Sequence, residues 1–198
     1  MAPARTPSRE ETLAVVRRSI RREPLSTSDG RLIDDYVDGH ALLGDPTGLA
    51  GCCELVCERL RELRPVAVVG EVAAACGLVS GVVLRCQQEG IALQGRYLRK
   101  AQKGYGVTGL LNTGLAPASR VVVLDDVTGK GDAAMRVVEA LRSEGHEVAA
   151  MVVVLDRGEG AAERLDGLGV ELSWLFDLRE AAGEVALHEA GAGGEHGR

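Results

Sequence analysis

The 198-residue chain has a mass of 20.8 kDa, with 45% hydrophobic and 26% charged residues, which is typical of a globular domain and excludes a disordered or fibrous protein. Its net charge of −6 and its aromatic content of 3% argue against a nucleic-acid-binding protein, which needs basic surfaces and stacking rings. No apolar run approaches the roughly 20 residues of a membrane span, and the first residues lack the apolar stretch of a secretion signal. We therefore expect a cytoplasmic protein that binds neither nucleic acid nor a membrane.

The N-terminal third of the chain predicts two helices around a short extended segment. Ser8 begins a capping box, and the amphipathic helix that follows it is expected to end near Pro24. Residues 32–37 have weak strand character. Asp45, followed by proline, is a helix N-cap, and this second helix should end before Pro65. The apolar residues at helical spacing in the two helices are Leu13, Val16, Ile20, Leu49, Cys53, Val56, Leu60 and Leu63.

From residue 66 onwards, apolar strands alternate with helices. The predicted strands are 66–70, 91–98, 120–125, 147–155 and 170–176, and the predicted helices are 72–88, 132–144 and 160–168. Strand cores without polar positions, such as VVVL, indicate a parallel sheet that is covered on both faces. We expect an α/β domain with a mainly parallel sheet over residues 41–182. A helix and a hood segment over residues 1–40 precede it, and a flexible tail over residues 183–198 follows it.

The remaining reactive or aromatic side chains form no motif. The five cysteines are odd in number and show no CxxC spacing, so we expect reduced thiols that serve as small core residues. The four histidines have no metal-ligand spacing, and we expect them on the surface or in the tail. Trp174 lies in the last predicted strand, where we expect it to be packed.

Two adjacent carboxylates mark the most informative strand end. In open parallel sheets, ligands bind beyond the carboxyl ends of the strands. One predicted strand delivers Asp125 and Asp126 into a glycine-containing turn that begins a helix. The backbone N–H groups of such a turn can bind phosphate, and the carboxylates can bind sugar hydroxyls or a hydrated magnesium ion. Alternatively, the turn binds nothing and Asp132 serves only as the N-cap of the helix.

The distribution of charge favours an anionic ligand. Residues 90–124 contain no Asp or Glu, although the chain average of 29 in 198 would give about five. The basic residues of this window are Arg96, Arg99, Lys100, Lys103 and Arg120. Three of them lie in the segment RKAQKGYG at residues 99–106, which suits a mobile loop that closes over a polyanion and neutralises its charge. The alternative is a basic loop that is merely solvated.

The segment RKAQKGYG and the later segment VVVLDDVTGKG, in this order and spacing, resemble the type I phosphoribosyltransferases, most closely the orotate phosphoribosyltransferases. The resemblance extends from about residue 29 to residue 176 and includes VLDRGEG at 154–160. It implies the type I fold, with a small hood over the sheet. It also implies a homodimeric enzyme that transfers ribose 5-phosphate from phosphoribosyl pyrophosphate to a planar anionic base and releases pyrophosphate.

The resemblance also implies roles for individual residues. Asp125 and Asp126 would hold the ribose hydroxyls, close to a magnesium ion that bridges pyrophosphate and ribose. Arg157 would bind the carboxylate of the base, and Tyr36 would belong to the lip of the substrate site. The residues that cradle the 5-phosphate would be Thr128, Gly129, Lys130, Gly131, Asp132 and Ala133. The residues of the basic loop, which reaches the neighbouring subunit's site and supports the departing pyrophosphate, would be Arg99, Lys100 and Lys103. Tyr105, which follows them in sequence, would bind substrate. Cations at the leaving group stabilise charge that grows in the transition state.

The chain departs from the family pattern at several positions. Asp132 and Glu71 place carboxylates where the family binds phosphate groups, while Ser28 and Asp35 change the substrate lip. Three functions therefore remain open. The first is an orotate-type phosphoribosyltransferase, the second a divergent phosphoribosyltransferase with another base in a specialised pathway, and the third a non-catalytic binding or partner protein on this scaffold.

Overall fold

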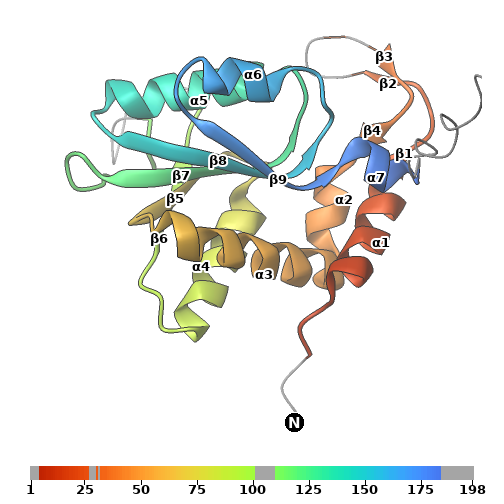
Figure 1. The fold of residues 1–198 in the computed structure, drawn as a ribbon, viewed down its shortest axis with the longest axis horizontal. Helices are drawn as coiled ribbons and strands as arrows, with labels where there is room; N and C mark the ends of the chain where they lie inside the picture. The colour runs from red at the N-terminus through yellow and green to blue at the C-terminus, as the bar shows by residue number, and fades with distance from the viewer. Residues whose placement is uncertain (1–4, 27–29, 31, 101–109, 184–198) are drawn as a thin grey trace, which may run out of the picture.

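The computed structural model describes residues 5–26, 30, 32–100 and 110–183, and its centre is a parallel sheet between two layers of helices (Figure 1). The strand order in the sheet is β6-β5-β7-β8-β9, and every neighbouring pair is parallel. The strands are β5 (Ala67–Glu71), β6 (Gln94–Leu98), β7 (Arg120–Thr128), β8 (Glu147–Asp156) and β9 (Glu171–Asp177). The predicted α/β class and parallel sheet are confirmed. None of the described helices is both long and apolar enough to cross a membrane.

The alternation of side chains along the strands explains why both faces of the sheet are covered. In β7, Val121 and Val123 belong to a core shared with α5 (Asp132–Ser143) and α6 (Ala161–Asp166). Val122 and Leu124 face the opposite core, which α3 (Pro46–Leu63) and α4 (Cys76–Gln88) close. Successive side chains of a strand point to opposite faces, so an all-apolar strand can be buried only between two helical layers.

The N-terminal region packs on the α3 side of the sheet. The predicted capping box is present at Ser8, but α1 (Arg9–Ser19) ends earlier than expected, because the chain turns at Ile20 into a short antiparallel ladder. This ladder joins β1 (Ile20–Arg21) to β4 (Tyr36–Val37), and a second ladder joins β2 (Leu25–Ser26) to β3 (Leu32–Ile33). The short helix α2 (Gly39–Gly44), which Asp38 caps, was not predicted. Six residues are too few to show a helical period.

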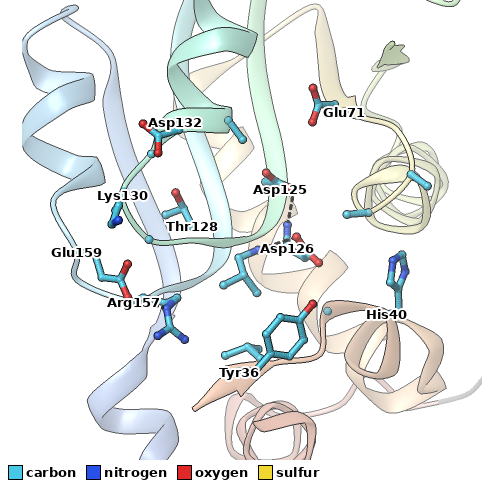
Figure 2. A pocket seen from close by; sticks show the side chains of 18 of the residues that line it. Tyr36, His40, Glu71, Asp125, Asp126, Thr128, Lys130, Asp132, Arg157 and Glu159 are labelled. Atoms are coloured by element: carbon cyan, nitrogen blue, oxygen red, sulfur yellow. Dashed lines mark hydrogen bonds and ion pairs between the residues drawn. The ribbon is translucent and has the colours of Figure 1, made fainter. Parts of the chain in front are cut away.

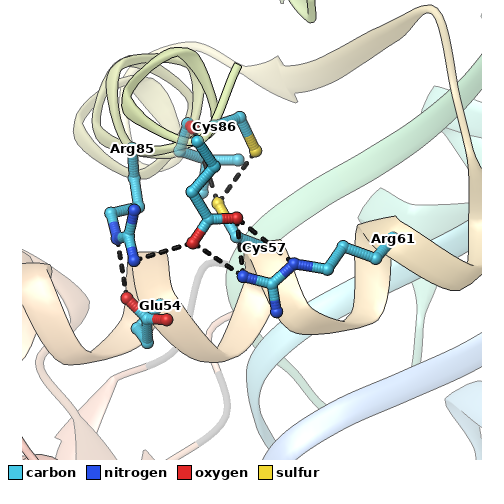
Figure 3. Close-up of polar contacts among 7 residues, drawn as sticks. Glu54, Cys57, Arg61, Arg85 and Cys86 are labelled. Carbon is cyan, nitrogen blue, oxygen red and sulfur yellow. Dashed lines mark hydrogen bonds and ion pairs between the residues drawn. The ribbon is translucent and has the colours of Figure 1, made fainter. Parts of the chain in front are cut away.

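Thiols and ion pairs hold α3 against α4 (Figure 3). The sulfur atoms of Cys57 on α3 and Cys86 on α4 lie 2.9 Å apart. On the solvent side of this contact, Arg85 binds Glu54 at 2.6 Å, and Arg61 binds Glu89 at 2.6 Å. All five cysteines are free thiols, as predicted. Four of them are buried, and Cys76 is partly exposed.

Four sequence-based expectations need correction. His146, which was expected on the surface, is buried, because the chain enters β8 directly after it. The segment 72–75 forms a turn beside the site, and α4 begins only at Cys76. Strand β7 continues beyond the predicted end to Thr128, because Thr128 still pairs with Asp156 of β8. Trp174 is 45% exposed and does not pack in the core, since β9 is an edge strand with a neighbour on one side only. Helix α7 (Leu178–Ala182) follows this strand and packs against α1.

Candidate functional site

A pocket of about 500 Å³ opens at the carboxyl ends of β5, β7 and β8, where sequence reasoning placed the ligand site. Its walls come from the lip around β4, the turn after β5, the turn between β7 and α5, and the residues after β8 (Figure 2). The lining residues are Ile33, Tyr36, Val37, Gly39, His40, Glu71, Val72, Ala73, Ala74, Lys100, Asp125, Asp126, Val127, Thr128, Gly129, Lys130, Gly131, Asp132, Ala133, Arg157 and Glu159.

Asp125 and Asp126 form the floor of this pocket. The backbone N–H of Asp126 donates to Oδ1 of Asp125 at 3.0 Å, and the N–H of Val127 donates to Oδ1 of Asp126 at 2.8 Å. Burial, followed by the charge of Asp126, raises the pKa of Asp125 well above its usual range. Gly39 makes room for Asp126, because an added Cβ at Gly39 would lie 1.7 Å from its Oδ2. Such a pair can accept hydrogen bonds from ligand hydroxyls.

The turn between β7 and α5 presents backbone N–H groups to the pocket. Gly131 is the N-cap of α5 at φ 81°, and an added Cβ there would lie 3.1 Å from Ala161. No side chain of the described residues caps α5. The first backbone N–H groups of this helix therefore face the pocket without a side-chain acceptor. The alternative that Asp132 serves as the N-cap is wrong. Asp132 is the first residue of the helix, and no described side chain takes the place of an anion at the N-terminus of α5.

An arginine neutralises each of the two carboxylates that depart from the family pattern. Oδ1 of Asp132 accepts from Arg164 of α6 at 2.6 Å, and this guanidinium also donates to the carbonyl of Lys130 at 2.6 Å. Both oxygens of Glu71 accept from Arg136 of α5, at 2.7 and 2.9 Å. The net charge that these carboxylates add to the pocket is therefore small.

Arg157 joins the end of β8 to the lip. One guanidinium nitrogen donates to the backbone carbonyl of Asp35 at 2.8 Å, and the other donates to Oδ1 of the same residue at 2.8 Å. Its Nε donates to Glu159 at 3.0 Å. Burial lowers the pKa of Arg157, but the hydrogen bonds and charges of Asp35 and Glu159 outweigh burial, so the pKa is raised. Tyr36 lines the pocket near this guanidinium (Figure 2).

The structure brings most of the predicted site residues together. Lys100, Tyr36, Arg157, both aspartates and the whole turn 128–133 line the pocket. Arg99 does not line it, because its guanidinium donates to the carbonyls of Leu111 at 3.2 Å and Asn112 at 3.5 Å. Lys103 and Tyr105 lie outside the described residues.

Sequence reasoning missed two polar residues of the pocket. His40 is exposed, as expected, but it also lines the pocket, because α2 follows the lip directly. Glu159 lies two residues after Arg157 and accepts a hydrogen bond from the Nε of this arginine. The sequence offered one signal for each residue: His40 lies close to the lip residue Tyr36, and Glu159 lies close to Arg157.

The donor set limits what kind of metal ion the pocket could hold. Within residues 5–26, 30, 32–100 and 110–183, no group of three or more His, Cys, Asp or Glu side chains forms a metal-binding cluster. Asp125 and Asp126 alone supply carboxylate oxygens on the pocket floor. This set fits a magnesium ion whose ligands are mainly substrate phosphates and water, because magnesium retains several waters and needs only one or two carboxylates.

Comparison with known proteins gave sequence relatives and structural neighbours, while no protein-family model matches the chain. The orotate phosphoribosyltransferase of Aeropyrum pernix is 33% identical over 190 residues, which cover 93% of this chain and 96% of the relative. That of Bradyrhizobium sp. (strain ORS 278) is 30% identical over 182 residues, covering 89% of this chain and 98% of the relative. The crystal structure of Mycobacterium tuberculosis orotate phosphoribosyltransferase with Fe(III) dicitrate has a TM-score of 0.77 at 26% identity and covers 88% of this chain and 99% of that one. The same enzyme in complex with phosphoribosyl pyrophosphate has a TM-score of 0.73 at 25% identity, with 88% and 99% coverage.

Proposed function

Because the chain belongs to the orotate phosphoribosyltransferase family and has the type I phosphoribosyltransferase fold, we propose that it transfers ribose 5-phosphate from phosphoribosyl pyrophosphate to orotate or a closely related anionic base. One observation carries the proposal: a carboxylate pair, an uncapped helix N-terminus and a partly buried arginine line a single pocket. These are the groups that ribose hydroxyls, a phosphate and a carboxylated base require.

The pocket suggests how each part of the substrates binds. Asp125 and Asp126 accept hydrogen bonds from the ribose hydroxyls, and the N–H groups of the turn 128–133 hold the 5-phosphate. Pyrophosphate lies beside the turn 72–74, with Lys100 near it, and the base lies against Tyr36 and Arg157. Arg99 and Lys103 belong to a basic loop that supports the departing pyrophosphate, and Tyr105 binds substrate.

The chemistry exchanges one bond at C1 of the ribose for another. The bond from C1 to the pyrophosphate oxygen breaks, and its electron pair leaves with pyrophosphate. A nitrogen of the base forms the new bond to C1 and releases its proton to the solvent. The ribose ring becomes positively charged between these events, so the carboxylates below it and the cations at the leaving group stabilise the transition state. Magnesium, when bound, neutralises charge on the pyrophosphate. The carboxylates of Asp125 and Asp126, which line the pocket, support this use of the ion.

We also propose a cytoplasmic homodimer in which the basic loop reaches the neighbouring subunit's site. The resemblance to the family supports this arrangement, and light scattering tests the dimer. We propose the division of the chain into a hood segment over residues 1–40, a catalytic domain over residues 41–182 and a tail beyond it.

The direct test is incubation with phosphoribosyl pyrophosphate, magnesium and orotate, with the nucleotide product measured by mass spectrometry. We expect product from the wild-type enzyme and none from the double variant Asp125→Asn, Asp126→Asn, whose fold is checked by circular dichroism. No product at high enzyme concentration overturns the orotate assignment.

A second candidate is a phosphoribosyltransferase for a different base, and the contact of Asp35 with Arg157 favours it. A panel of bases in the same assay separates the two candidates. A non-catalytic scaffold loses its main support, because arginines neutralise Asp132 and Glu71. Magnesium-dependent binding of phosphoribosyl pyrophosphate in a calorimetric titration would contradict it further.

A further inference from the structure

The guanidinium of Arg157 already holds a carboxylate of the protein itself. One nitrogen donates to Oδ1 of Asp35 at 2.8 Å, and Asp35 lies 122 residues away in sequence, immediately before β4. Two more of its five N–H groups donate to the backbone carbonyl of Asp35 and to Glu159, so two carboxylates share the charge of this guanidinium. An anionic base that approached Arg157 would therefore meet a guanidinium that is already neutralised.

The two partners differ in their freedom to move. The side chain of Arg157 is 10% exposed, whereas that of Asp35 is 36% exposed. A buried guanidinium needs a carboxylate partner, because an unpaired charge in the protein interior is costly. Asp35 can turn towards water and be solvated there, so its carboxylate can be exchanged for another one. The backbone carbonyl of Asp35 would continue to hold Arg157 in place during the exchange.

We propose that Asp35 is a specificity-determining residue, an internal carboxylate that competes with the carboxylate of the base for Arg157. This inference rests on the proposed function. In the absence of a base, Asp35 keeps Arg157 neutralised and oriented. When a carboxylated base binds, it must displace the Asp35 side chain, which lowers the affinity for such bases relative to bases without a carboxylate.

The substitution Asp35→Asn tests the competition, because it removes the charge and keeps the shape and the backbone carbonyl. Calorimetric titration with orotate and with uracil, a probe without the carboxylate, gives the two dissociation constants. We expect the dissociation constant of orotate to fall about tenfold, the size expected for one hydrogen bond to a charged group, and that of uracil to stay unchanged. Asp35→Ser, which also removes the charge, should show the same difference between the two probes.

Asp34→Asn is the matched control, since it removes the same charge from the exposed neighbouring residue. It should change neither dissociation constant. In an Arg157→Gln background, Asp35→Asn should lose its effect on orotate. The inference is overturned if Asp35→Asn leaves orotate binding unchanged or undetectable, or if it shifts orotate and uracil equally.

The outcome for the proposed function is read separately. If orotate binds more tightly to Asp35→Asn but neither protein forms a nucleotide with phosphoribosyl pyrophosphate and magnesium, the transferase assignment fails and the competition stands. If both proteins form nucleotide but their orotate constants agree, the transferase assignment stands and the role of Asp35 fails.

Discussion

The pairing of Asp132 with Arg164 makes a quantitative prediction about phosphate binding. Arg164 binds the carboxylate of Asp132 at 2.6 Å. The side chain of Asp132 is 68% exposed, and that of Arg164 is 43% exposed. Arg164→Ala leaves an unneutralised carboxylate beside the turn proposed to bind the 5-phosphate. At a separation of about 6 Å in a water-like dielectric of about 80, one carboxylate and a phosphate dianion repel by about 1.4 kcal/mol, or roughly tenfold in affinity.

The assay is a calorimetric titration of phosphoribosyl pyrophosphate with magnesium. Arg164→Ala should raise the dissociation constant about tenfold at low salt and less at high salt, because ions screen exposed charges. Asp132→Asn should leave or slightly improve the wild-type affinity, and the double variant should bind like Asp132→Asn. The thermal stability of Arg164→Ala should change little, since an exposed ion pair contributes about 0–1 kcal/mol. The reasoning fails if the double variant binds as weakly as Arg164→Ala, because the arginine would then contact the phosphate itself.

Three further predictions concern the pocket floor and the thiols. Gly39→Ala should displace Asp126 and lower kcat/KM about 10- to 100-fold, whereas Gly44→Ala, at a glycine of the same helix with open space around it, should not; equal activities would show that Asp126 does not need this position. Asp125→Asn should abolish transfer but raise Tm at pH 7, because it removes the free-energy cost of burying a charged carboxylate. Tm should rise by roughly 2–4 °C for each kcal/mol of this cost. Since folding raises the pKa of Asp125 above its usual 3.8, the stability that its protonated form contributes is lost as pH rises, so the gain should vanish below about pH 4; a gain that is independent of pH would contradict this. Finally, four of the five thiols are buried and Cys76 is partly exposed, so a thiol reagent should modify only Cys76 in the native protein; a second fast-reacting thiol, or one that persists in Cys76→Ser, would contradict the structure.

Much of the sheet could be read from the sequence because its signals are local. An all-apolar strand such as 121–124 and a capping box at Ser8 each depend on a few neighbouring residues. The position of Asp125 and Asp126 followed from the same logic, since the residues after a buried parallel strand lie at the edge where ligands bind. The end of β7 at Thr128 has no such local signal, because it depends on pairing with Asp156 of β8.

The state of the pocket charges was decided only by the tertiary structure. Asp132 meets Arg164, Glu71 meets Arg136, and Asp35 meets Arg157, although 32, 65 and 122 residues separate the partners. No periodicity or spacing encodes such pairs, because they form only where separate elements converge at one edge of the sheet. The sequence by itself therefore determined the fold class and the place of the site. The tertiary structure decided that the two unusual carboxylates are neutralised and that Asp35 already occupies the arginine proposed to bind the base.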